Sequence, residues 1–162
     1  MQRLVSMQEA AAPWVEVARD GLRTGALASA ATTATLAWLG QRSDRAPAGP
    51  LNAVSHILWG ERAAEQDGLS AKYTAAGVGL NALAVSGWSL VHALLFRRRA
   101  PKSIARALAG GALVSGLAYW VDYHVVPDRL APGFEKRLEG RELLAVYSVL
   151  ALCFAFGSRA RV

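Results

Sequence analysis

The stretch that decides the fold is Tyr73-Thr-Ala-Ala-Gly-Val-Gly-Leu-Asn-Ala-Leu-Ala-Val-Ser-Gly-Trp-Ser-Leu-Val-His-Ala-Leu-Leu-Phe96, which contains no Asp, Glu, Lys or Arg. A helix of about 20 mostly apolar residues is long enough to cross the hydrocarbon core of a bilayer. The stretch therefore predicts a membrane-spanning helix over residues 73–96. It also makes an integral membrane protein the expected class for the whole chain.

Three further stretches are poor in charged residues, and they predict spans over about 22–40, 104–123 and 140–158. The composition agrees, since 53% of the 162 residues are hydrophobic and 19% are charged. The lone Cys153 lies in an apolar run, which excludes a secreted domain held by disulfides. Short connections between apolar helices favour antiparallel neighbours. We therefore expect one all-α integral-membrane domain over residues 1–162, folded as a transmembrane four-helix bundle.

The basic residues predict which way the spans run. One side of a four-span topology would carry both termini and the turn between the second and third spans, with ten bases and three acids. The other side would carry eight bases and nine acids. Short loops rich in Lys and Arg stay in the cytoplasm. We expect both termini to be cytoplasmic and the loops 41–72 and 124–139 to lie on the outer side.

The basic turn predicts a partner as well as a direction. Arg97, Arg98, Arg99 and Lys102 lie beside the end of the second span, where anionic lipid headgroups are the nearest counter-charge. The formal net charge of +6 could also indicate nucleic acid, but no nucleic-acid-binding motif accompanies it. Membrane lipids are therefore the expected partner, and nucleic acid is not.

The first outer loop contains a second apolar pattern. In Leu51-Asn-Ala-Val-Ser-His-Ile-Leu-Trp59, which follows Pro50, the apolar side chains recur at helical spacing. Proline is suited to the first turn of a helix. The pattern predicts a short interfacial helix that lies in the outer leaflet.

The outer loops also carry the polar residues with the most chemistry. His56, Asp122 and His124 would lie on one face of the membrane, and His and Asp are both metal ligands and acid–base groups. One interpretation is a metal site, and another is a hydrolase that pairs Ser55 or Ser70 with these residues. The Asp-x-His spacing matches no specific ligand signature, and no nucleophile-elbow glycines are present. We favour a third interpretation, in which these side chains tie the two loops together by hydrogen bonds.

Two polar residues lie inside the 73–96 span. Asn81 is at mid-span and His92 is about one turn from its end. Polar groups inside a bilayer usually face the interior of a helix bundle. We expect both to make structural hydrogen bonds, because no second histidine at a similar depth is present to hold a haem. No cofactor is predicted.

The loop sequences Leu51-Asn-Ala-Val-Ser-His-Ile-Leu-Trp-Gly60 and Val121-Asp-Tyr-His-Val-Val-Pro127 resemble those of small, uncharacterised bacterial inner-membrane proteins with four spans. The resemblance covers most of the chain. It implies a bacterial inner membrane, and it carries over no catalytic residue.

Three classes of function remain from the sequence. The first is a non-enzymatic accessory protein that binds a protein partner, a second copy or a lipid. The second is an outer-face metal-binding protein or membrane hydrolase that uses His56, Asp122 and His124. The third is a small transporter or channel, which would need an ionisable residue in the core of a span or a broken helix. We favour the first, because it needs only packing surfaces.

Overall fold

Helices are the only regular secondary structure in the described part of the chain. A computed structural model describes residues 2–96 and 103–157, with side chains from residue 14 onward, and it contains no strand in these ranges. The elements are α1 (Gln2–Ser43), α2 (Gly49–Val54), α3 (His56–Trp59), η1 (Glu61–Ala63), α4 (Thr74–Phe96), α5 (Ile104–His124), η3 (Asp128–Leu130), η4 (Phe134–Lys136) and α6 (Gly140–Gly157).

Four long helices pack in the order α4, α1, α6, α5. Helix α1 lies between α4 and α6, and α5 packs mainly against α6. Interhelical hydrogen bonds fix these pairs. Asn81 of α4 donates to the hydroxyl of Thr32 in α1 at 3.1 Å, and Ser115 of α5 donates to the backbone carbonyl of Tyr147 in α6 at 2.6 Å. Helices α4 and α5 contact each other less extensively, and Phe96 lies against Gly110 there.

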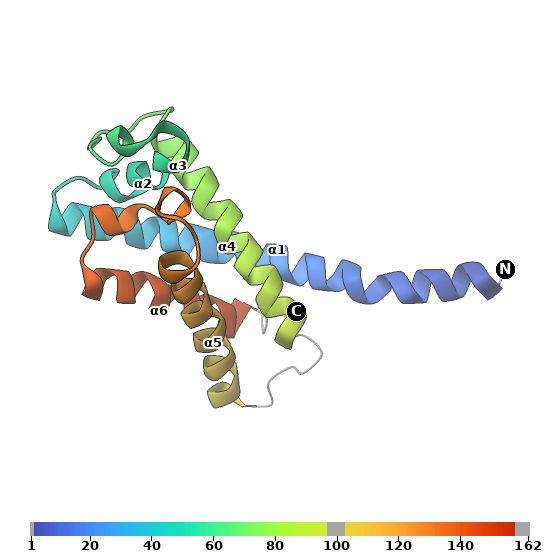
Figure 1. Cartoon of the computed structure of the whole chain (residues 1–162). Coiled ribbons are helices and arrows are strands. Elements are labelled where there is room, and N and C mark those ends of the chain that lie inside the picture. Colours follow the sequence, from blue (N-terminus) through green and yellow to red (C-terminus); the bar gives the residue numbers. More distant parts are fainter. Residues whose placement is uncertain (1, 97–102, 158–162) are drawn as a thin grey trace.

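Among the residues that the structure describes, three helices are long and apolar enough to cross a membrane: α4, α5 and α6. Their bounds agree closely with the spans expected over 73–96, 104–123 and 140–158. Helix α1 contains the fourth expected span, 22–40, but it is not among these three, because that stretch is mostly Ala and Thr. At 1.5 Å per residue, its 42 residues make a helix about 63 Å long. Its N-terminal part extends well beyond the other helices (Figure 1).

The distribution of side-chain sizes is that of helices in lipid. On α5 the buried stripe consists mostly of Gly, Ala and Ser, whereas Leu113 and Leu117 are exposed. On α4 the buried stripe includes Gly77, Asn81 and Ser89, whereas Leu83 is 72% exposed. In water the leucines would be buried first, but in a bilayer small residues allow helices to approach and leucines meet lipid. The pattern supports a membrane protein.

The short helices α2 and α3 lie at one end of the molecule, which we call the loop end; it also carries residues 125–139. The expected helix over 51–59 is present, but it begins at Gly49 and is broken at Ser55. All residues of α2 are buried against protein, including Leu51, and only Leu58 and Trp59 are substantially exposed. The apolar face predicted to lie on the membrane is thus covered by α1, α4 and η4.

Asn52 holds this end together from a fully buried position. Its side-chain nitrogen donates to the carbonyls of Gln66 and Gly68 at 2.8 and 2.9 Å, and its oxygen accepts from Thr74 at 2.6 Å. An unsatisfied buried amide would be costly, so these three bonds fix the path of the loop before α4.

Helix α4 can approach α2 because residue 77 is glycine. A Cβ atom at this position would lie 1.8 Å from the backbone carbonyl oxygen of Leu51, which is far inside contact distance. Neither element can move easily, because α2 is buried on all sides and α4 is bonded to α1. The glycine is therefore required by the packing.

We predict that Gly77→Ala destabilises the protein by about 1–3 kcal/mol or more, the usual cost of overpacking. Thermal unfolding of the purified protein measures the change. The matched control is Gly79→Ala on the same helix, where no atom lies within 4 Å of the added carbon. That variant should be neutral or stabilised by up to about 1 kcal/mol through helix propensity. Equal melting temperatures for the two variants would contradict the close contact.

Candidate ligand-binding cavity

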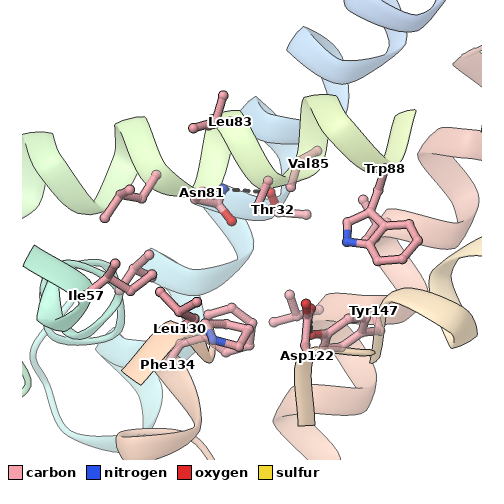
Figure 2. Close-up of a pocket in the computed structure, with 16 residues that line it drawn as sticks. Thr32, Ile57, Asn81, Leu83, Val85, Trp88, Asp122, Leu130, Phe134 and Tyr147 are labelled. Carbon is pink, nitrogen blue, oxygen red and sulfur yellow. Dashed lines mark hydrogen bonds between the residues drawn. The ribbon is translucent and has the colours of Figure 1, made fainter. Parts of the chain in front are cut away.

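A cavity of about 230 Å³ lies between α4 and α6, bordered by the segment 130–134 and the last turn of α5 (Figure 2). Its walls come from α4 (Leu80, Asn81, Leu83, Ala84, Val85, Trp88), α6 (Val146, Tyr147, Leu150), the segment 130–134, and Thr32, Val54, Ile57 and Asp122. An apolar cavity of about 150 Å³ is enough to bind benzene. This cavity can hold a substituted ring or a short section of a lipid chain.

The cavity is open on one side. Leu83 and Leu130 both line it, and they are 72% and 54% exposed. Leu83 lies on α4, a helix apolar enough to face lipid, so a ligand can reach the cavity from the surface of that helix.

Two acceptor groups face the cavity from different walls. The side-chain nitrogen of Asn81 donates to Thr32 and Thr33 at 3.1 and 3.3 Å, so its oxygen receives no donor within the described part of the chain. Asp122, in the last turn of α5, accepts a 2.6 Å hydrogen bond from the hydroxyl of Tyr147 at Oδ2. Its Oδ1 has no partner among the side chains that the structure describes. Both groups are free to accept a hydrogen bond from a ligand.

Three aromatic rings share the space that Asp122 faces. Trp88, Phe134 and Tyr147 all line the cavity, and the rings of Phe134 and Tyr147 are 6.4 Å apart (Figure 2). The indole nitrogen of Trp88 points toward the cavity in the same view. The cavity is therefore apolar and aromatic, with a few polar groups at fixed positions, which is the usual composition of a small-molecule site.

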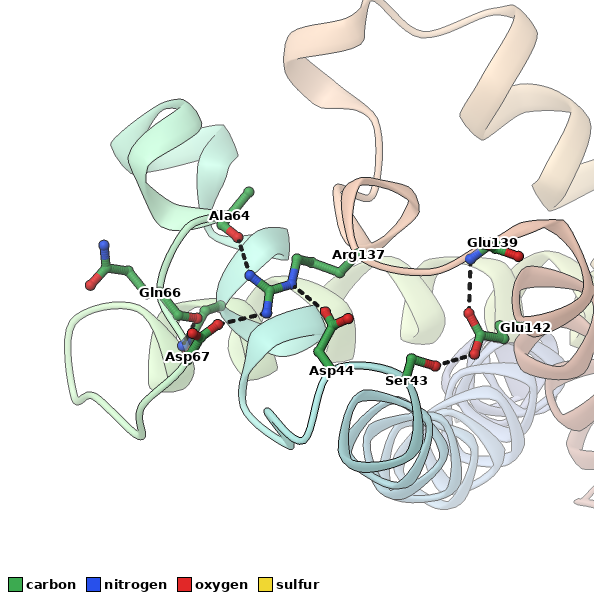
Figure 3. Close-up of polar contacts among 9 residues, drawn as sticks. Ser43, Asp44, Ala64, Gln66, Asp67, Arg137, Glu139 and Glu142 are labelled. Atoms are coloured by element: carbon green, nitrogen blue, oxygen red, sulfur yellow. Dashed lines mark hydrogen bonds and ion pairs between the residues drawn. The ribbon is translucent and has the colours of Figure 1, made fainter.

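The segment 128–138 closes the loop end of the cavity, and Arg137 fixes this segment. Its guanidinium donates to Asp44 at 3.0 Å, to Asp67 at 2.6 Å and to the carbonyl of Ala64 at 3.0 Å (Figure 3). One side chain thus joins the end of α1 and the loop before α4 to the segment 128–138, which we call the cavity cover. The planar fork of arginine makes such a three-way contact possible.

A second ion pair joins the same two loops. Lys136 donates to Glu61 at 2.8 Å. This hydrogen bond from the ammonium lowers the pKa of the Glu61 carboxyl below its usual value. Glu61 is exposed, so the pair adds little to stability.

His56 is buried between the loop 41–72 and the loop 124–139 and connects them by hydrogen bonds. It is 1% exposed, its Nδ1 lies 3.0 Å from the carbonyl oxygen of Ala53, and its Nε2 lies 3.2 Å from that of Asp128. Gly133, which has a positive φ of 91°, packs directly on the ring, where a Cβ atom would lie 2.5 Å from Nδ1. The expected meeting of the two loops is confirmed.

The three residues predicted as one polar cluster have separate surroundings. His56 is bonded to backbone carbonyls, Asp122 is bonded to Tyr147, and His124 is exposed with its ring stacked on Trp120. Within the described residues, no group of three or more His, Cys, Asp or Glu side chains could hold a metal ion. The serines considered for a hydrolase also have structural roles. Ser55 donates to the carbonyl of Asn52, and Ser70 accepts from backbone amides at the start of α4.

The intramembrane polar residues lie on the buried stripe of α4. Asn81 forms the expected hydrogen bonds to α1, and it also faces the cavity. The ring of His92 stacks on Phe154 at 5.4 Å and lies 5.1 Å from that of Phe96. Arg97, Arg98, Arg99 and Lys102, expected to contact lipid headgroups, lie outside the described residues.

Sequence reasoning missed Arg137, Tyr147 and Trp88. Arg137 is one of many basic residues in the chain and carries no local signal. Tyr147 offered a weak one, because a hydroxyl in a predicted span needs a partner when it is buried. Its partner, Asp122, is on a different helix.

The fold and the cavity define a helical protein whose described part holds three helices that are long and apolar enough to cross a membrane. Comparison with protein-family models, with curated proteins and with solved structures finds no match.

We predict that Arg137→Lys destabilises the protein by about 1–2 kcal/mol, because a single ammonium cannot keep three contacts that diverge from a planar fork. The melting temperature should fall by roughly 2–8 °C for a chain of this size. Arg141→Lys, at an exposed position on α6, is the control and should leave it nearly unchanged. Equal shifts in the two variants would show that Arg137 does not fix the loops.

Proposed function

We propose that the chain is a non-enzymatic, multi-pass membrane protein that binds an apolar ligand from the bilayer, such as a section of a lipid, in the cavity between α4 and α6. The observation that carries the proposal is the cavity of about 230 Å³ with its apolar walls and its open side at Leu83. An accessory subunit that presents or senses a lipid needs such a site and no catalytic group.

The fixed loop end supports a binding role. The segment that supplies Leu130, Pro132 and Phe134 to the cavity is held by Arg137, and Asn52 holds the loop before α4. A preformed site binds more tightly than one that must be ordered by its ligand. These contacts keep the cavity open before a ligand arrives.

We further propose four crossings, with α1 as the fourth, in a bacterial inner membrane and with both termini in the cytoplasm. Helix α1 packs between α4 and α6, so two of its sides meet protein and need not be apolar. This shielding explains how an Ala- and Thr-rich helix can cross. The ten bases on the proposed inner side support the direction.

The topology is tested with reporters. A phosphatase that is active only in the periplasm should be inactive when fused after Val162. It should be active when inserted after Gly68, because this residue is exposed and no atom lies within 4 Å of where a Cβ atom would be. Periplasmic activity at the C-terminal fusion would reject the direction. The crossing by α1 is tested with Gln2→Cys and Gly68→Cys, which lie on either side of it and are labelled in intact cells with a membrane-impermeant maleimide. Only Gly68→Cys should react, and labelling of both positions would reject the fourth crossing.

The cavity is tested with neopentylbenzene, an apolar probe somewhat larger than benzene. Calorimetric titration of the protein in nanodiscs should show saturable binding beyond the partitioning into empty nanodiscs. Ala84→Phe, which adds a ring to the cavity wall, should weaken binding at least tenfold by occupying the site. Ala109→Phe on the exposed face of α5 is the control and should bind as the unchanged protein does. Absence of saturable binding, or equal loss in both variants, would reject the proposal.

A further inference from the structure

Asp122 occupies an unusual position for a carboxylate. It lies in the last turn of α5, where the unsatisfied carbonyls of a helix end carry partial negative charge and favour cations. Only one of its oxygens has a hydrogen-bond donor among the described residues, the hydroxyl of Tyr147. The site is short of positive charge.

Two of the three cations in the segment 128–138 are engaged in ion pairs: Lys136 pairs with Glu61, and Arg137 pairs with Asp44 and Asp67. The third, Arg129, is exposed. No ion pair to Asp122 occurs within the part of the chain that the structure describes. The carboxylate therefore faces the cavity without a counter-ion from these residues.

The aromatic rings also favour a positively charged ligand. Trp88, Phe134 and Tyr147 line the cavity together with Asp122. The face of an aromatic ring attracts a cation, and rings grouped around one space are a recurring way to bind quaternary ammonium groups. A carboxylate and three rings act on the same charge by independent interactions.

We infer that the ligand of this cavity is an organic cation, an amine or quaternary ammonium group carried on an apolar body. The inference rests on the proposed ligand-binding function and names the class of its ligand. The charged group lies between Asp122 and the rings of Trp88 and Tyr147. The apolar body fills the space toward Leu83 and leaves through the open side. A neutral alcohol could donate a hydrogen bond to Asp122 but would gain little from the aromatic rings. Positive charge is therefore the property that distinguishes the inferred ligand from an alcohol.

The experiment compares two probes of nearly the same shape. Benzyltrimethylammonium carries a positive nitrogen where neopentylbenzene carries a neutral carbon. We expect the unchanged protein in nanodiscs to bind the ammonium probe more tightly than the neutral one. Asp122→Asn keeps the shape and the acceptor for Tyr147, and it should weaken ammonium binding about tenfold while changing neopentylbenzene binding less than about twofold.

Two further variants separate local from general effects. Glu139→Gln removes a negative charge at an exposed position just before α6, and Glu139 does not line the cavity. It should change the affinity for the ammonium probe less than about twofold. Trp88→Leu keeps an apolar wall and should weaken binding of the ammonium probe more than that of neopentylbenzene.

The outcomes are distinguishable. If neopentylbenzene binds saturably but the ammonium probe binds no better, or Asp122→Asn weakens both equally, the cation inference is overturned and the proposed cavity function stands. If Glu139→Gln weakens binding of the ammonium probe as much as Asp122→Asn does, the preference is one of general charge and the inference is overturned. If neither probe binds, the cavity function and the inference fall together.

Discussion

The close packing of α4 against α1 is the contact on which the cavity depends. Small residues let the two helices approach. The 3.1 Å hydrogen bond from Asn81 to Thr32 fixes their register. Helix α6 packs on the other side of α1, and Ser115 holds α5 to α6. The cavity lies between α4 and α6, beside the segment 130–134, so its position follows from which helices pack.

The loop end keeps that space from collapsing. Arg137, His56 and Asn52 each join segments distant in sequence, and each has its polar atoms directed at protein partners. Buried polar groups are costly when unpaired, so these networks hold one arrangement of the loops and disfavour others. Asp122 differs from them, because one oxygen is left facing the cavity. That difference is why we assign it to a ligand.

The sequence predicted the helices well where a single physical constraint applied. The run from Tyr73 to Phe96 has only one way to cross a bilayer, because every backbone group must be bonded within a helix. At Leu51 the helix was predicted, but its apolar face was assigned to lipid and is covered by protein. The spacing of apolar residues is the same in both cases, so it could not decide between them. It also grouped His56, Asp122 and His124 by loop membership, which fixes the side of the membrane but not the distance between side chains.

The sequence by itself therefore determined the class of structure, namely long apolar helices joined by polar loops. A long run without charged residues indicates a helix in apolar surroundings, whatever the rest of the fold is. The partners of Asp122 and Arg137 were decided only by the tertiary structure. Arg137 bonds to residues 70 and 93 positions away, and Asp122 to a tyrosine 25 positions away on another helix. Such pairs depend on how helices rotate and cross when small residues meet, and no spacing along the chain records that rotation.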